Sequence, residues 1–333
     1  MIKKSLLVVI LLSSIFCSAQ KLRKRTTMLM GSRFDITIIS TDSLTAENRI
    51  NEAIAEITRI ENLISDWKSD SQVSEVNQNA GIRAVKVDKE VFDLTKRALY
   101  ISQLTNGAFD ISYAAMDKIW RFDDTMTEMP SPEVIQKSVE KVGYQNIILD
   151  SIQSTIFLKK QGMKIGFGSI GKGYAADKAR EIMQSKGVLS GIINASGDMA
   201  TWGTQTDGTN WNIGITNPFK TNDLVAIVPL KTEAVTTSGS YEKFVELNGQ
   251  RYSHIINPKT GYPATGLVSV TVFGPSAEMA NGFSTSIIVL GQDEGLKLID
   301  QFSDYICLII TDKGKVIKSK KFRFKMKVSK IKK

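Results

Sequence analysis

Short β-rich segments between residues 145 and 274 constrain the fold of this chain more than any other feature. Runs of β-branched and aromatic residues bounded by turn residues predict strands. They occur at 145–150, 154–158, 163–167, 190–195, 211–215, 224–230, 242–247, 251–256 and 267–274. Two predicted helices interrupt them, at 173–186 before Gly187 and at 276–290 before Gly291. Strands punctuated by a few helices favour an α+β fold with a largely antiparallel sheet and flanking helices, rather than regular βαβ alternation.

The first part of the chain is more helical. A strand is predicted over 33–39, after a basic leader. Isoleucines three or four positions apart predict an amphipathic helix over 43–64, with Ser43 near its N-cap. A second helix is predicted over 89–104, and Ser131-Pro132 has the pattern of an N-cap followed by Pro at the first helical position of a third. We find no repeat and no long linker, so we expect one compact unit with two closely packed lobes.

The first nineteen residues have the pattern of a signal peptide. Lys3 and Lys4 precede an apolar run over 6–16, and the small residues of Cys17-Ser18-Ala19 suit cleavage before Gln20. The run is shorter than the ~20 apolar residues that a membrane-spanning helix needs. Lipid anchoring through Cys17 is the alternative, which the bulky Phe16 disfavours. We therefore expect an exported, periplasmic protein, with inner-membrane association left open.

The positive net charge of +9 is concentrated at the C-terminus. Residues 313–333 contain eleven basic and no acidic residues, and without them 32 basic residues face 34 acidic ones. The alternation of basic and aromatic residues over 321–325 predicts a final edge strand. The basic tail could contact anionic lipid headgroups or serve only as a solvated terminus. A nucleic-acid partner is disfavoured because the body carries no matching basic charge.

The chain has a single histidine, His254, where a predicted strand runs into a turn rich in Pro and Gly. Functional groups are often displayed at such junctions. Histidine is also the side chain whose ordinary pKa lies near neutrality, so His254 is the first candidate for a general base at neutral pH. The alternative is a structural hydrogen-bonding group. If Cys17 leaves with the signal, Cys307 is the remaining cysteine, so we expect no internal disulfide and a buried thiol.

A glycine-rich loop over 166–174 opens a predicted helix and contains Lys172. Backbone N–H groups at a helix start, together with a lysine, suit an anion. The spacing does not match a Walker phosphate loop, and it fits a dinucleotide fingerprint only incidentally. A glycine turn packed on a sheet is an equally good interpretation of the spacing alone.

Further polar and aromatic residues are weak signals one by one. Asn281 and Thr285 lie one helical turn apart, where their oxygens could join a Mg²⁺ site or form only a polar stripe. Trp67, Phe109 and Trp120 could stack on a planar ring or be core residues. Asp198 is interpreted as a turn residue.

Taken in order, these segments resemble the ApbE family, the FAD:protein FMN transferases, over residues 28 to 291. The segments that carry the resemblance are Met30-Gly31-Ser32, Ser65-Asp66-Trp67 with Asn77, Gly107-Ala108-Phe109-Asp110, Gly171-Lys172-Gly173-Tyr174 with Asp177, Ser196-Gly197-Asp198, Thr237-Ser238-Gly239, residues 253–261 and residues 280–285. Each motif is modest, whereas the ordered set is highly specific.

The resemblance implies the two-lobed ApbE architecture, related to the T-fold, with FAD in the cleft of a single catalytic domain over 20–312. It implies an FAD site lined by Met30, Trp67, Ala108, Phe109, Asp110, Gly166, Lys172 and Ile255. It places Ser169, Asn281 and Thr285 around Mg²⁺ (or Mn²⁺), with Ser284 nearby and His254 as the catalytic base. The implied reaction is metal-dependent transfer of FMN from FAD to a Thr or Ser hydroxyl of an exported or membrane-bound flavoprotein subunit, as in membrane redox complexes, with release of AMP.

The chain departs from the family pattern at three positions. Asn281 and Asn257 stand where the family usually has Asp, and Trp67 stands where Tyr is common. Since Asn281 removes a negative charge beside the cation, we expect weaker metal binding and a gain from Asn281→Asp. Two alternatives to transfer therefore stay open: an FAD pyrophosphatase that releases FMN and AMP, and an exported protein that binds FAD without turnover.

Overall fold

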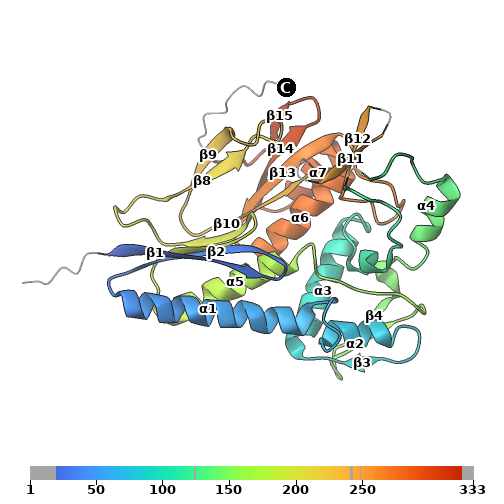
Figure 1. The fold of residues 1–333 in the computed structure, drawn as a ribbon, viewed down its shortest axis with the longest axis horizontal. Helices are drawn as coiled ribbons and strands as arrows, with labels where there is room; N and C mark the ends of the chain where they lie inside the picture. The colour runs from blue at the N-terminus through green and yellow to red at the C-terminus, as the bar shows by residue number, and fades with distance from the viewer. Residues whose placement is uncertain (1–19, 124, 241–242, 248, 325–333) are drawn as a thin grey trace, which may run out of the picture.

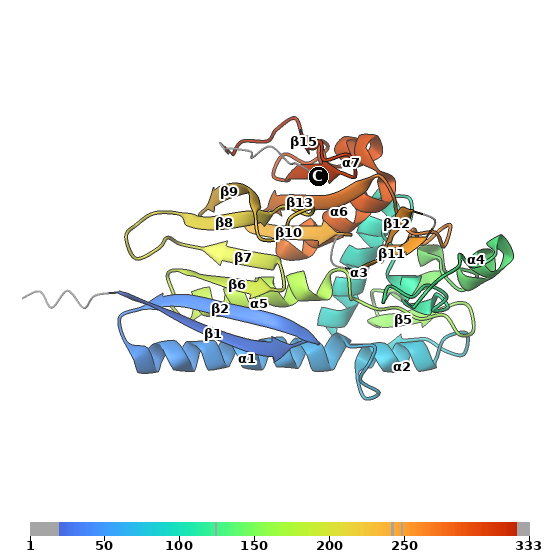
Figure 2. The ribbon, with the colours of Figure 1, turned by 45° about the horizontal axis from the view of Figure 1, so that its top comes forward.

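The computed structural model describes residues 20–123, 125–240, 243–247 and 249–324 (Figure 1). Its centre is an eight-stranded sheet in the order β1-β2-β6-β7-β10-β13-β14-β15, and every neighbouring pair is antiparallel. The strands are β1 (Lys21–Leu29), β2 (Ser32–Ser40), β6 (Gly191–Ala195), β7 (Asp198–Trp202), β10 (Ala234–Gly239), β13 (Leu267–Gly274), β14 (Ile306–Thr311) and β15 (Val316–Lys318). Figure 2 shows these strands stacked from β1 to β15. The α+β prediction with a largely antiparallel sheet is confirmed.

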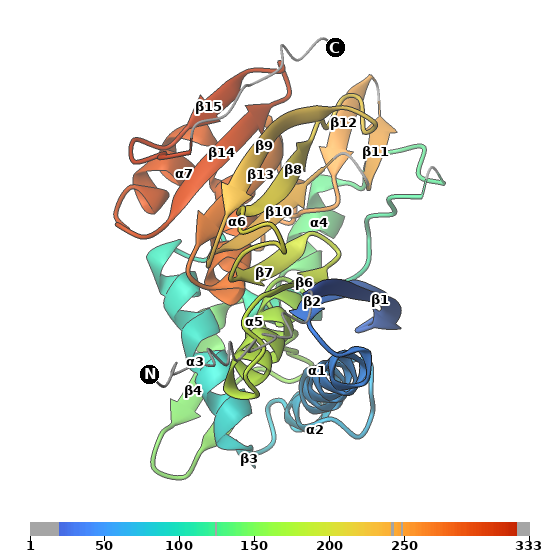
Figure 3. The same cartoon turned by 90° about the vertical axis from the view of Figure 1, so that its left-hand side faces the viewer.

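Helices cover one face of this sheet and a hairpin covers the other (Figures 1 and 3). The helices are α1 (Ser43–Ile64), α5 (Gly171–Ser185), α6 (Ala277–Leu290) and α7 (Gln292–Ile299). The hairpin pairs β8 (Trp211–Thr216) with β9 (Leu224–Leu230), and its apolar side chains pack with Val235, Phe273 and Ile306 of the sheet. Since both faces are covered, β13 and β14 are buried along their whole length.

A second lobe lies beside the helical layer, at the α4 end of the molecule in Figure 1. It contains α2 (Gln72–Gln78), α3 (Lys89–Leu104), η1 (Ile111–Ala115), α4 (Pro132–Ser138), η2 (Tyr144–Asn146) and a small sheet of β3 (Val85–Lys86), β5 (Thr155–Leu158) and β4 (Ile147–Asp150). The hairpin of β11 (Phe244–Leu247) and β12 (Gln250–Ser253) lies on the same side. Among the described residues, no helix is long and apolar enough to cross a bilayer.

One strand predicted between residues 145 and 274 does not form. Residues 163–167 belong to no sheet, although Met163, Ile165 and Phe167 point into the core. Asn77 takes the place of a partner strand, because its side chain accepts a hydrogen bond from the Ile165 N–H (2.8 Å) and donates to the Ile165 carbonyl (2.9 Å). An apolar alternation therefore predicted the burial of this segment correctly and its pairing wrongly.

Other differences concern element ends and short elements. Asp42, not Ser43, caps α1 by accepting from the Thr45 N–H. The predicted edge strand over 321–325 is wrong for residues 321–324, since β15 is the edge strand and Phe322 and Phe324 pack on Phe273. The basic leader forms β1, and α2, α7 and β7 were not predicted. The signal peptide over 1–19 and the end of the basic tail from 325 lie outside the described residues.

Candidate active site

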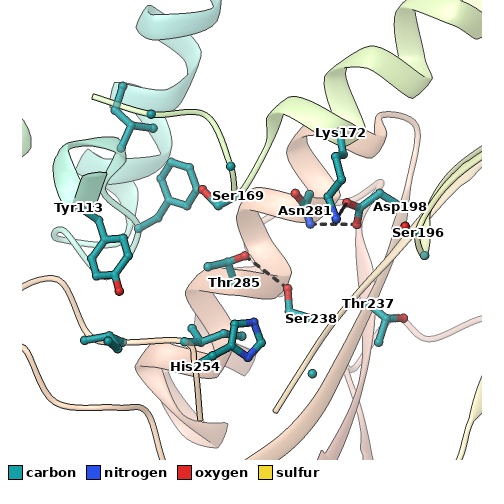
Figure 4. Close-up of a pocket in the computed structure, with 18 of the residues that line it drawn as sticks. Tyr113, Ser169, Lys172, Ser196, Asp198, Thr237, Ser238, His254, Asn281 and Thr285 are labelled. Carbon is teal, nitrogen blue, oxygen red and sulfur yellow. Dashed lines mark hydrogen bonds and ion pairs between the residues drawn. The ribbon is translucent and has the colours of Figure 1, made fainter. Parts of the chain in front are cut away.

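A cavity of about 630 Å³ lies between the second lobe and the first lobe, which contains the central sheet (Figure 4). Its walls come from the loop after α3, the start of α5, the strands β7, β8 and β10, the turn after β12, and α6. Most residues that the resemblance assigned to a site line it: Trp67, Ala108, Phe109, Asp110, Gly166, Ser169, Lys172, His254, Ile255, Asn281 and Thr285. Met30 does not line it. The Met30 N–H donates to Glu61 (2.9 Å) in a turn where Met30 has φ of 50°.

The glycine-rich loop leads directly into α5, whose first residue is Gly171. No side chain caps this helix start, and Ser169 and Lys172 beside it line the cavity, so the positive end of the helix dipole lies near the cavity. Gly173 allows α5 to approach α6, because a Cβ there would lie 2.5 Å from the Ala277 carbonyl oxygen. This close approach brings Lys172 of α5 next to Asn281 of α6 (Figure 4).

Lys172, Asp198 and Asn281 form a charged cluster at one side of the cavity (Figure 4). The Lys172 Nζ lies 3.5 Å from Asp198 Oδ2, and the Asn281 amide Nδ2 donates to Asp198 Oδ1 (3.0 Å). Burial raises the pKa of Asp198 to about 6, against the opposing effect of Lys172. Asp198 was interpreted from sequence only as a turn residue, since its partners lie 26 and 83 positions away.

Oxygen atoms gather beside this cluster. The Ser238 hydroxyl lies 2.8 Å from that of Ser284 and 3.3 Å from that of Thr285. The Asn281 Oδ1 is buried and has no hydrogen-bond partner in the part of the chain that the structure describes. A buried, unpartnered oxygen on the wall of a cavity suits a hard cation. The residues assigned to Mg²⁺ therefore fit it, although no group of three His, Cys, Asp or Glu among the described residues could hold a metal.

His254 is held at the start of the turn after β12. Its Nδ1 lies 3.0 Å from the Lys243 carbonyl oxygen, and Phe122 meets its ring edge-on at 6.5 Å. Because a carbonyl only accepts, Nδ1 carries the proton in the neutral ring and Nε2 is the basic nitrogen. Figure 4 shows the ring turned toward the cavity, across from Lys172 and Asp198. This arrangement allows His254 to accept a proton from a ligand in the cavity.

The Asp110 carboxylate accepts hydrogen bonds from within the protein. Its Oδ1 accepts from the Ser112 N–H (2.8 Å) and hydroxyl (2.6 Å), and its Oδ2 accepts from the Tyr144 N–H (2.8 Å). Burial raises the pKa of this carboxyl, and the three hydrogen bonds oppose that effect. Asp110 therefore shapes the cavity wall by fixing the loop that carries Ala108 and Phe109.

The aromatic residues have different environments. Trp67 is 81% exposed, and the Lys118 Nζ lies 4.6 Å from its ring centroid. Trp67 and Tyr113 line both this cavity and a second, adjoining one of about 650 Å³. Trp120 is buried, donates to the Gly261 carbonyl (2.8 Å) and lines only the second cavity. Of the three aromatics considered for stacking, Trp67 and Phe109 reach the first cavity.

Fold and site together define a class: a two-lobed α+β protein whose cavity contains a lysine at a helix start, side-chain oxygens of Asn281 and Thr285, and a histidine. A match to the ApbE family covers residues 30–309, and the chain belongs to this family. The motifs quoted from sequence thus identified the family correctly.

Relatives and solved structures agree over most of the chain. An FAD:protein FMN transferase of Klebsiella pneumoniae is 30% identical over 294 residues, which are 88% of this chain and 90% of the relative. The crystal structure of the ApbE protein of Thermotoga maritima is 30% identical and has a TM-score of 0.81, with 90% and 97% of the two chains covered. The apo flavinyl transferase ApbE of Pseudomonas stutzeri is 28% identical with a TM-score of 0.78, covering 93% and 95%.

Proposed function

We propose that this chain is an exported FAD:protein FMN transferase, which moves FMN from FAD to a Thr or Ser hydroxyl of another protein and releases AMP. The observation that carries the proposal is one cavity that contains Lys172, the unpartnered Asn281 Oδ1 and the His254 ring. The names of the relatives support the same activity. The cavity volume suits an extended ligand of this size.

FAD binding is assigned to opposite sides of the cavity. Lys172 and the uncapped start of α5 attract the diphosphate. Trp67, Ala108, Phe109 and Ile255 offer apolar surface to the ring systems of FAD. Gly166 allows the wall to pack closely on Ala114 and Asp66, since a Cβ there would lie 3.0 Å from Ala114 and 3.2 Å from Asp66.

Asn281, Thr285 and Ser169 would hold the cation, Mg²⁺ or Mn²⁺. When bound, a divalent cation offsets negative charge on a diphosphate, which phosphoryl transfer generally requires. The neutral oxygens of these residues suit a cation that keeps part of its water shell.

His254 is assigned the role of general base. Its Nε2 accepts the proton of the acceptor hydroxyl, and the hydroxyl oxygen forms a bond to the FMN-side phosphorus. The bond from that phosphorus to the bridging oxygen breaks, and AMP leaves with the oxygen. The Lys243 carbonyl keeps the ring in the tautomer that this step needs and stabilises the imidazolium that results.

We assign the acceptor to the exported flavoproteins or membrane-bound redox subunits, because the signal-peptide pattern over 1–19 places this chain in the same compartment. The basic tail would then face anionic lipid. These two assignments rest on the sequence.

The test is to incubate the mature chain with FAD, Mg²⁺ and an exported flavoprotein subunit that another family member modifies, and to weigh the acceptor by intact-protein mass spectrometry. We expect a mass gain of one FMN phosphoester, which His254→Ala abolishes. Free FMN and AMP without a mass gain would instead indicate an FAD pyrophosphatase. Bound FAD with no AMP release would indicate a flavin-binding protein.

A further inference from the structure

The orientation of the Asn281 amide is determined by Asp198. An ionised carboxylate only accepts hydrogen bonds, so the amide must turn its Nδ2 toward Asp198 Oδ1, at 3.0 Å. The Oδ1 then points away from Asp198 and is buried without a partner among the residues that the structure describes. The opposite amide orientation would set two acceptors against each other. Asp198 thereby presents the Asn281 oxygen as a ligand.

Asp198 is itself held in place. Lys172 lies 3.5 Å from its other oxygen, and the turn before it contains Ser196 and Gly197, with φ of 52° and 98°. The Gly197 N–H donates to Asn194 Oδ1 at 2.8 Å, which fixes this turn at the start of β7. A carboxylate that is 3% exposed and bonded from two sides has little freedom to move.

We propose that Asp198 is a positioning residue for the cation site. It orients the Asn281 amide by accepting a hydrogen bond from it, and it places behind that amide the negative charge that position 281 itself lacks. This inference rests on the proposed cation-dependent function. Outer carboxylates that hydrogen-bond a ligand commonly fix its orientation and strengthen metal binding. With Asp198 in this role, Asn281→Asp is expected to weaken cation binding instead of improving it. A carboxylate at 281 would lie next to that of Asp198, with Lys172 as the cation between them.

The charge arrangement can be tested by exchanging the two residues. Asp198→Asn keeps an acceptor for the amide but removes the charge, and Asn281→Asp brings two carboxylates together. The double variant Asp198→Asn/Asn281→Asp restores one carboxylate and one amide in contact. We expect each single variant to bind Mn²⁺ about tenfold or more weakly than the natural chain, and the double variant to recover most of that loss.

Mn²⁺ binding to the mature chain is measured by electron paramagnetic resonance, with and without FAD and without any acceptor. Asp35→Asn is the matched control. Asp35 is also an ion-paired carboxylate of the central sheet, next to Lys24 and Arg33, but it does not line the cavity and does not contact α5 or α6. We expect its Mn²⁺ binding to be unchanged, and thermal unfolding reports whether each variant is folded.

Three results would overturn the inference: Mn²⁺ binding by Asp198→Asn equal to that of the natural chain, a double variant no better than the worse single one, or no Mn²⁺ binding by the natural chain. Failure of the proposed function gives a different result. In that case the binding cycle holds while no acceptor gains FMN.

Discussion

At the residue scale, the cavity combines side chains that serve a ligand with side chains that serve the protein. Trp67 is exposed and its ring contacts the Lys118 ammonium group, so its removal leaves the core intact. Asp110, in contrast, has both carboxylate oxygens occupied by protein donors. Lining a cavity is therefore not enough to make a residue a ligand contact.

Trp67→Ala should weaken FAD binding without changing protein stability. Loss of an aromatic stacking partner costs about 0.5–1.5 kcal/mol, or roughly a two- to tenfold rise in Kd. Titration of FAD fluorescence measures the effect, and Trp67→Phe should retain most of the affinity. Ile152→Ala is the control, because Ile152 is 95% exposed and does not line the cavity. An equal loss in both variants would contradict the assignment.

Asp110→Ala should lower the free energy of unfolding. It leaves three buried donors without their acceptor, at a cost of about 1–3 kcal/mol. Urea unfolding followed by circular dichroism measures the change. If the variant kept its stability but lost FAD binding, Asp110 would be a ligand contact rather than a support of the wall.

At the element scale, the site depends on how closely α5 and α6 approach each other. Gly173 of α5 faces the Ala277 carbonyl of α6, and the same two helices carry Lys172 and Asn281. A change in their separation therefore alters the cation site as well as the packing.

Gly173→Ala should destabilise the protein by about 1–3 kcal/mol, because its Cβ would meet backbone atoms that cannot move independently. Mn²⁺ binding should fall at the same time. Gly168→Ala is the matched control, since a Cβ there meets nothing within 4 Å. Differential scanning calorimetry measures the melting temperatures of both variants, and equal melting temperatures would refute the argument.

Sequence patterns predicted the long helices but missed several strands and the short helices α2 and α7. The nine-residue β1 is the segment expected to be a basic leader, and β14 was not predicted. The helices over 43–64 and 89–104 have the predicted bounds, because long apolar periodicity specifies a helix and its length. The helix α2 has seven residues, too few for a clear period. The alternation over 163–167 predicts a strand that does not form, because alternation reports burial and not the pairing partner. The residues assigned to FAD, the cation and the base through the family motifs line the cavity, except Met30. The motifs include Asp198 without a role, because its contact with Asn281 spans 83 positions and exists only in the folded chain.

At the scale of the whole molecule, the sheet buries its centre from both faces. Cys307 lies in β14 and is fully buried, and burial raises the pKa of its thiol to about 12. The thiolate is the reactive form, so folding protects this cysteine twice, by exclusion and by protonation.

The mature chain should therefore react with a thiol reagent only as it unfolds. Labelling by Ellman's reagent at neutral pH should be slow in buffer and complete in denaturant. Fast labelling of the folded chain would show that β14 opens locally.

The two outermost strands of the sheet share a chemical character. Four of the first five residues of β1 are basic: Lys21, Arg23, Lys24 and Arg25. At the other end, Lys315 and Lys320 flank β15, which ends at Lys318. An exposed edge strand is a template for pairing with another chain, and lysine-rich edges discourage that pairing. Lys24, Arg25 and Lys320 are ion-paired with acidic residues, whereas Lys21, Arg23, Lys315 and Lys318 have no ion pair among the described residues. Both borders therefore keep a positive character, and two borders repel each other. The basic residues thus help to keep an open sheet from growing into a filament.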